Sequence, residues 1–112
     1  MYHGERAAGT TDPGPVTVTV DGETYPLKPQ WSWCVFNWGY YGSGPRHLAF
    51  ALLVDATGNR DFAGAHCQGF KEIVISQLGD EWSLSERDIG NWIRAHRLRE
   101  SPPALIALDA KP

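Results

Sequence analysis

The sequence predicts a small α+β protein, in which a mainly antiparallel sheet of three to four strands packs against three helices. The clearest strand is Val16–Val20, because it alternates β-branched valine and threonine. The clearest helix surrounds Leu48–Val54, because every residue there is apolar, and a helix that is apolar all round is normally buried. Two later stretches, 60–78 and 85–96, repeat apolar residues at helical spacing and complete the helical layer.

The chain of 112 residues has the length of one domain, and a domain of this size can bury a core of its own. We assign residues 1–100 to a single α+β domain. Residues 101–112 are assigned to a C-terminal tail, because Pro102 and Pro103 break any helix that reaches them. The apolar segment Ala104–Leu108 in this tail either docks as a last strand or stays loosely attached.

A β-hairpin is expected near the N-terminus. Asp21 and Gly22 follow the alternating run and are a strong hairpin-turn signal, so Thr24–Lys28 is predicted to be the returning strand. Pro26 cannot donate a backbone hydrogen bond to a neighbouring strand, which indicates an edge position or a short strand. Tyr2–Arg6 is a further candidate strand.

A strand, a glycine-rich turn and the apolar helix are expected in succession. The stretch Trp31–Trp38 has two apolar faces, which predicts a strand inside the sheet or under the helices. In the turn that follows, Gly39, Gly42 and Gly44 are expected to allow positive φ. Ser43 is expected to cap the helix with its hydroxyl.

The second helix is expected over Arg60–Leu78, with an apolar stripe flanked by Ala63 and Cys67 and formed by Phe62, His66, Phe70, Ile73 and Val74. Gly69 either weakens this helix or permits close packing against a neighbour.

A linker and a third helix follow. Asp80–Leu84 is interpreted as the linker, and Ser85 is predicted to cap a helix that ends near His96. Its buried face is expected to carry Ile89, Trp92 and Ile93.

Composition favours a protein of the cytoplasm. The net charge of −3 argues mildly against wholesale binding to nucleic acid. Cys34 and Cys67 form no CxxC pair, so we expect buried, reduced thiols. Residues 1–9 lack the apolar region of a signal peptide, and no apolar run reaches the ~20 residues of a membrane helix. No membrane association is expected.

No catalytic, cofactor or metal site is predicted. The four histidines, at positions 3, 47, 66 and 96, have no metal-ligand spacing with one another or with a cysteine. Both cysteines lie in apolar stretches, where a thiol is generally inert. The turn lacks the phosphate-binding fingerprints, so a tight connection is favoured over an anion site beside Arg46 and His47.

Two surfaces are candidates for binding a macromolecule. A protein partner is expected at the glycine-rich turn, on a surface formed by Trp31, Tyr40, Tyr41, Arg46 and His47. Tyr and Trp in a rigid turn are good anchors, although the same rings could instead fill the interface between sheet and helices. A nucleic acid is the second candidate partner, at a basic cluster formed by Arg94, Arg97 and Arg99 with His96. Cations at a helix C-terminus are also what the helix dipole favours.

The segment Trp38–Leu53 reads WGYYGSGPRHLAFALL. It resembles the WGYxGSGPxxLAxALL signature of a family of short proteins of unknown function from bacterial, archaeal and phage or plasmid genomes. Tyr41 stands where a glycine is usual and His47 where a glutamine is usual. Most of residues 1–93 takes part in the resemblance, which includes Tyr2-x-Gly4, Val18-x-Val20-Asp21-Gly22, Phe70-Lys71 and Leu84 to Trp92.

The resemblance implies an accessory protein of a mobile genetic element and carries no catalytic residues over. In that setting we expect a non-enzymatic protein-binding protein, in its most concrete form an inhibitor of a host defence complex of the anti-CRISPR type. One alternative is a nucleic-acid-binding accessory protein that uses the basic helix end. Another is a small ligand-binding or enzymatic domain that uses the glycine-rich turn. No cofactor is expected.

Overall fold

The computed structural model describes residues 1–6, 14–30 and 35–100, and these confirm the predicted α+β fold. The described elements are β1 (Tyr2–Glu5), β2 (Val16–Val20), β3 (Glu23–Pro26), α1 (Ser43–Thr57), α2 (Arg60–Ile73), the 3₁₀ turn η1 (Ile75–Gln77), β4 (Glu81–Leu84) and α3 (Glu86–Glu100). The segment 101–112, with the apolar run of the tail, lies outside the described residues.

The four described strands form one antiparallel sheet in the order β3-β2-β1-β4. The first strand of the chain therefore lies inside the sheet, between β2 and β4. The predicted hairpin is confirmed, since Asp21 and Gly22 have φ of 52° and 83°, the left-handed values that a tight two-residue turn requires. β3 lies at an edge of the described sheet, as Pro26 led us to expect.

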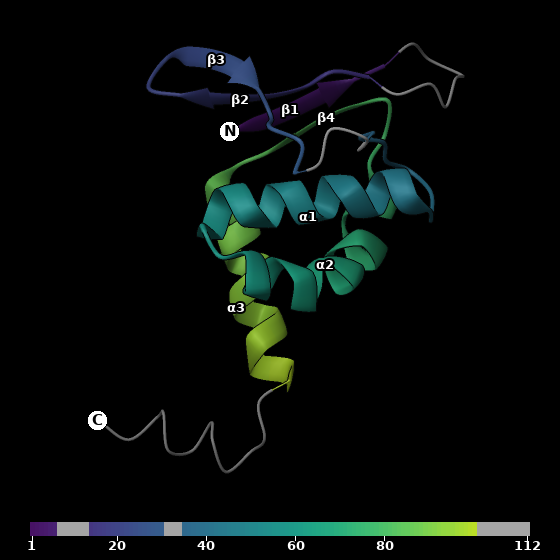
Figure 1. Ribbon diagram of the computed structural model, residues 1–112, viewed down its shortest axis with the longest axis vertical. Coiled ribbons are helices and arrows are strands. Elements are labelled where there is room, and N and C mark those ends of the chain that lie inside the picture. Colours follow the sequence, from purple (N-terminus) through teal and green to yellow (C-terminus); the bar gives the residue numbers. More distant parts are fainter. Residues whose placement is uncertain (7–13, 31–34, 101–112) are drawn as a thin grey trace.

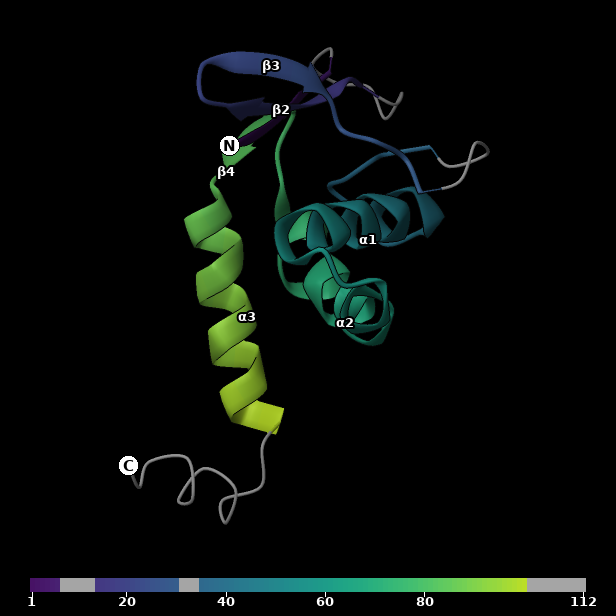
Figure 2. The ribbon, with the colours of Figure 1, turned by 60° about the vertical axis from the view of Figure 1, so that its left-hand side comes forward.

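The helix α1 forms the middle layer of the molecule. Figure 1 shows the sheet above α1 and the helix α2 below it, on the side away from the sheet. The helix α3 follows β4 and runs down beside the other two helices (Figure 2). Because α1 is covered from two sides, it can be apolar all round, and Leu48, Leu52 and Leu53 are fully buried.

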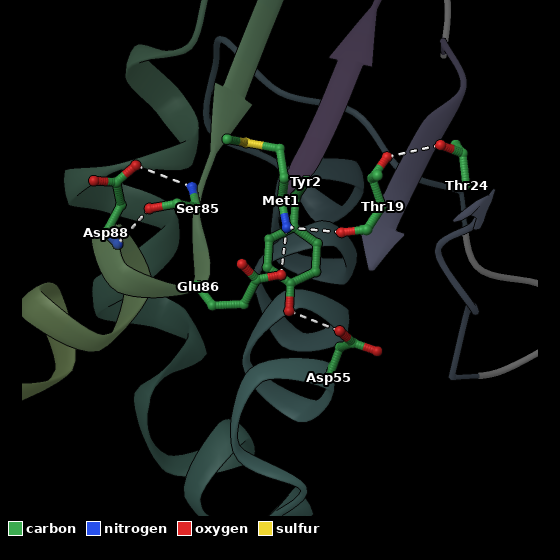
Figure 3. Close-up of polar contacts among 8 residues, drawn as sticks. All are labelled: Met1, Tyr2, Thr19, Thr24, Asp55, Ser85, Glu86 and Asp88. Carbon is green, nitrogen blue, oxygen red and sulfur yellow. Dashed lines mark hydrogen bonds and ion pairs between the residues drawn. The ribbon is translucent and has the colours of Figure 1, made fainter. Parts of the chain in front are cut away.

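The N-terminus is fixed between β2 and the start of α3. The terminal amine of Met1 donates to the carbonyl oxygen of Thr19 at 3.2 Å and forms an ion pair with Glu86 (Figure 3). The hydrogen bond from this amine lowers the pKa of Glu86. The buried Tyr2 donates its hydroxyl to Asp55 of α1 at 2.7 Å. Burial, and then the contact with Asp55, raise the pKa of Tyr2 well above its ordinary value.

One predicted strand is wrong in its described part. Residues 35–38 are irregular chain, and residues 31–34 of the same prediction lie outside the described residues. Trp38 is nevertheless fully buried. Its indole N–H donates to the carbonyl of Gly79 at 2.7 Å, and its ring meets Trp82 edge-on with centroids 5.6 Å apart. Trp38 is therefore a core side chain that irregular chain supplies.

The segment Asp80–Leu84, predicted to be a linker, contains a strand. Glu81–Leu84 forms β4, because it pairs with the inner strand β1 over its whole length. A segment of four residues has too short a pattern to predict a strand, and the partner strand lies near the opposite end of the chain.

The N-cap of the helix α1 lies one position before the predicted cap. Gly42 is the N-cap residue, and its carbonyl accepts from the amide of Arg46 at 3.2 Å. Ser43 is the first helical residue, and no side chain caps the helix, so the predicted role of its hydroxyl is wrong. The helix ends at Thr57, and Gly58 is the C-cap residue with φ of 66°.

The helix α2 is shorter than predicted, because it ends at Ile73 and gives way to η1. Most of the predicted stripe is buried or partly buried, but Ile73 is half exposed at the end of the helix. Gly69 does permit close packing, since a Cβ added there would lie 3.3 Å from the ring of His96 on α3.

The helix α3 begins with the predicted cap. The hydroxyl of Ser85 accepts from the amide of Asp88 at 2.9 Å, and the carboxylate of Asp88 accepts from the amide of Ser85 at 3.0 Å (Figure 3). The hydrogen bond from the Ser85 amide to this carboxylate lowers the pKa of Asp88. The helix continues past His96 to Glu100. None of the described helices is long and apolar enough to cross a membrane.

Candidate functional site

The ring of Tyr40 folds back over the glycine-rich turn. A Cβ added to Gly42 would lie 2.9 Å from this ring, and one added to Gly44 would lie 2.8 Å from the Cβ of Asn37. Of these three glycines, only Gly39 has a φ in the left-handed region, of 83°. The expectation that all three glycines provide positive φ is therefore wrong for Gly42 and Gly44. Glycine is required at these two positions because neighbouring side chains occupy the space that a Cβ would fill.

A buried guanidinium fixes the chain just before this turn. Arg6, directly after β1, donates to the carbonyl of Trp38 at 2.9 Å and to the side-chain oxygen of Asn37. Its plane lies over the ring of Trp38 with 5.0 Å to the centroid, and its Nε lies 3.4 Å from the carboxylate of Asp80. The Arg6 side chain is only 8% exposed, so water competes weakly for these contacts. We call this group the Arg6 clamp.

No sequence pattern predicted the Arg6 clamp. Arg6 and Asn37 are 31 positions apart, and Arg6 and Asp80 are 74 apart. No local pattern indicates that such distant residues meet, because their pairing depends on how the layers pack.

Beyond the clamp, the turn exposes its aromatic side chains. Tyr41 is 64% exposed and Tyr40 is 38% exposed. The ammonium of Lys71, from α2, lies 5.8 Å from the centroid of the Tyr41 ring, so a cation–π contact supports one face of the ring. No sequence pattern predicted this contact either, because Lys71 lies 30 positions after Tyr41. Arg46, in the first part of α1, is exposed.

The other residues of the predicted protein-binding surface do not join this exposed group. His47 is partly buried and has contacts within the protein. Trp31 lies outside the described residues. The exposed aromatic turn is therefore formed by Tyr40, Tyr41 and Arg46, with Lys71 as support.

The basic end of α3 is described only in part. Arg94 is exposed and donates to the side chain of Asn91 at 3.0 Å. His96 stacks on Trp92 with centroids 4.6 Å apart, and it meets His66 of α2 edge-on. His96 therefore belongs to the packing between two helices rather than to an exposed basic cluster. The side chains of Arg97 and Arg99 lie outside the described residues.

The described cysteine has the environment of a structural thiol. Cys67 is buried in α2, and its thiol donates to the carbonyl of Gly64 at 3.8 Å. Cys34 lies outside the described residues.

The described residues form a small α+β domain with an exposed aromatic turn. The chain belongs to a family of unknown function, DUF6166, whose model matches residues 2–95. The match includes the described sheet, the glycine-rich turn, α1, α2 and most of α3. No curated protein and no solved structure matches the chain.

Proposed function

We propose that this protein is a non-enzymatic, protein-binding accessory protein that engages its partner through the exposed aromatic turn. The observation that carries the proposal is the position of Tyr41, which is 64% exposed on a turn that the Arg6 clamp holds in place. Tyr40 precedes it in the turn, and Arg46 is exposed in the first part of α1. Tyr and Arg are enriched among the residues that dominate binding energy in protein interfaces.

The support behind the turn makes such an anchor effective. Binding costs conformational entropy for each side chain and loop that becomes ordered. The backbone before Tyr41 is already fixed by Arg6, and Lys71 contacts its ring. The turn therefore loses little further conformational entropy when a partner covers the ring, so more of the contact energy appears as affinity.

The finer form of the proposal is an inhibitor of a host defence complex of the anti-CRISPR type. It rests on the sequence resemblance to proteins of mobile genetic elements. The net charge of −3 suits docking onto a basic nucleic-acid channel, but it is modest.

The test is capture of a partner from host lysate, followed by binding of the purified partner. Tyr41→Ala is expected to weaken binding at least tenfold, which corresponds to about 1.4 kcal/mol for the loss of one aromatic anchor. Tyr25→Ala is the matched control, because Tyr25 is 46% exposed but lies on the edge strand β3. Equal binding by wild type and a folded Tyr41→Ala variant would show that this surface is the wrong one.

Nucleic-acid binding is the second candidate, because Arg94 is an exposed cation near the end of α3. Under this alternative, affinity for DNA or RNA falls steeply with salt, and Arg94→Ala lowers the slope of log K against log salt by about one. Absence of binding even at low salt would reject the alternative.

A further inference from the structure

Three side chains with metal-binding atoms converge on the sheet face opposite the helices. Tyr2, His3, Gly4 and Glu5 alternate between the two faces of β1. His3 and Glu5 therefore point to the same face, whereas Tyr2 and Gly4 are buried. Glu81 lies directly opposite Glu5 on β4. One imidazole nitrogen and one oxygen from each carboxylate all lie within 4.8 Å of one another. Figure 1 shows the helices on the other side of the sheet, so they do not cover this group.

We propose that His3, Glu5 and Glu81 form a binding site for a divalent transition-metal ion, and that Zn²⁺ suits these donors best. A tetrahedral zinc ion, with bonds of about 2.0–2.2 Å, places its ligand atoms about 3.4 Å apart. The Nε2 of His3 already lies 3.6 Å from the carboxylate of Glu81. Small rotations of two exposed carboxylates would complete the geometry, and water would take the fourth position.

A hydrogen bond already orients the imidazole. The Nδ1 of His3 lies 3.0 Å from the hydroxyl oxygen of Ser83, the residue opposite it on β4. This contact turns Nε2 toward the carboxylates. Metal-binding histidines usually have such a partner on the second ring nitrogen, because it fixes the ring and the tautomer. The imidazole also decides the type of ion, because Mg²⁺ and Ca²⁺ prefer ligand sets made of oxygen.

The strand register forces the two carboxylates together. The amide of Arg6 donates to the carbonyl of Asp80 at 2.9 Å. Hydrogen-bonded and non-hydrogen-bonded pairs alternate in an antiparallel ladder, so the next pair, Glu5 and Glu81, is of the kind with closer side chains. Like charges directly opposite each other destabilise a sheet. Among the described residues, no ion pair joins a lysine or an arginine to either carboxylate. A bound cation would neutralise both charges.

The proposal is tested by titrating the untagged full chain with Zn²⁺ alone. Calorimetry measures the binding, and the melting temperature is measured with and without zinc. We expect saturable binding of one ion per chain and a rise in melting temperature with zinc, since the ion would join β1 to β4. His3→Ala is expected to abolish binding. Glu5→Gln and Glu81→Gln are each expected to weaken it at least tenfold, and Ser83→Ala about tenfold through the orientation of the ring.

Two choices keep the outcome clear. Zn²⁺ is used instead of Cu²⁺ or Ni²⁺, because a free terminal amine with histidine at position 3 can bind those two ions through backbone nitrogens in a planar arrangement. Glu23→Gln is the matched control, since Glu23 is an exposed carboxylate on β3, outside the cluster, and its removal should leave zinc binding unchanged. The proposal is overturned if no saturable binding occurs up to about 1 mM zinc. It is equally overturned if binding survives intact in His3→Ala and in both glutamine variants.

Discussion

Arg6 joins three parts of the chain that are far apart in sequence. Its guanidinium contacts Asn37, Trp38 and Asp80 in a nearly buried setting. Arg6→Ala is expected to lower the free energy of unfolding by about 2–3 kcal/mol, because it leaves buried acceptors without a charged donor. Arg6→Lys should lose much of the same stability, because a single ammonium cannot reach several acceptors in one plane.

Urea unfolding monitored by circular dichroism measures this effect. Arg94→Ala is the control, because Arg94 is exposed, and its change should stay within about 0.5 kcal/mol. If the two alanine variants are equally stable, the Arg6 clamp does not hold the turn.

Tyr2 gives the protein a specific weakness at high pH. A tyrosine in the unfolded chain ionises near pH 10, whereas burial and the contact with Asp55 raise the pKa of Tyr2 in the folded state. The folded state therefore holds this proton more tightly. The stability that this provides is complete below about pH 10 and is lost as the pH rises further.

Urea unfolding at several values above pH 10 should show this loss as a slope of up to about 1.4 kcal/mol per pH unit. Tyr2→Phe should remove that part of the slope, at a cost of about 1 kcal/mol at neutral pH for the lost hydrogen bond. Tyr25→Phe should retain the wild-type slope, because Tyr25 is exposed. Identical slopes in wild type and Tyr2→Phe would contradict the assignment.

Two helices differ in how they begin. The helix α3 has a reciprocal cap formed by Ser85 and Asp88, whereas α1 has Gly42 as its N-cap residue and no side-chain cap. Ser85→Ala should therefore cost about 1 kcal/mol in thermal or urea unfolding. Ser43→Ala should change stability by less than about 0.5 kcal/mol, since its hydroxyl caps nothing. A larger loss of stability in Ser43→Ala than in Ser85→Ala would indicate that Ser43 does cap α1.

The whole molecule depends on α1 as its central layer. Leu52 is fully buried in this helix, whereas Ile73 is 50% exposed at the end of α2. Leu52→Ala should lower the free energy of unfolding by about 2–5 kcal/mol, because it leaves a cavity between the sheet and α2. Ile73→Ala should cost less than about 1 kcal/mol, although the sequence pattern placed both residues on buried faces. Comparable losses in urea unfolding would contradict the layered arrangement.

Local patterns accounted for much of the fold. The alternation of Val16–Val20, the Asp21-Gly22 turn, the apolar run in α1 and the cap at Ser85 each lie within a few residues of one another, so neighbouring positions are enough to indicate them. The exposure of Tyr40 and Tyr41 did not follow from sequence, since the same rings could have filled the interface between sheet and helices.

The predictions were wrong where side-chain packing, and not the local pattern, decides the structure. The aromatic run before Trp38 resembles a strand, but the described residues 35–38 pack as a loop. The tight space around Gly42 and Gly44 comes from Tyr40 and Asn37, so those glycines are explained by packing rather than by backbone angles.

By itself, the sequence determined the fold class, the hairpin and the central helix, because periodicity and turn chemistry act over short distances along the chain. Only the tertiary structure decided that β4 pairs with β1, that Arg6 secures the aromatic turn, and that Glu81 meets His3 and Glu5. The physical reason is that these contacts join residues about 30 to 80 positions apart, and packing of the layers, not local preference, brings them together.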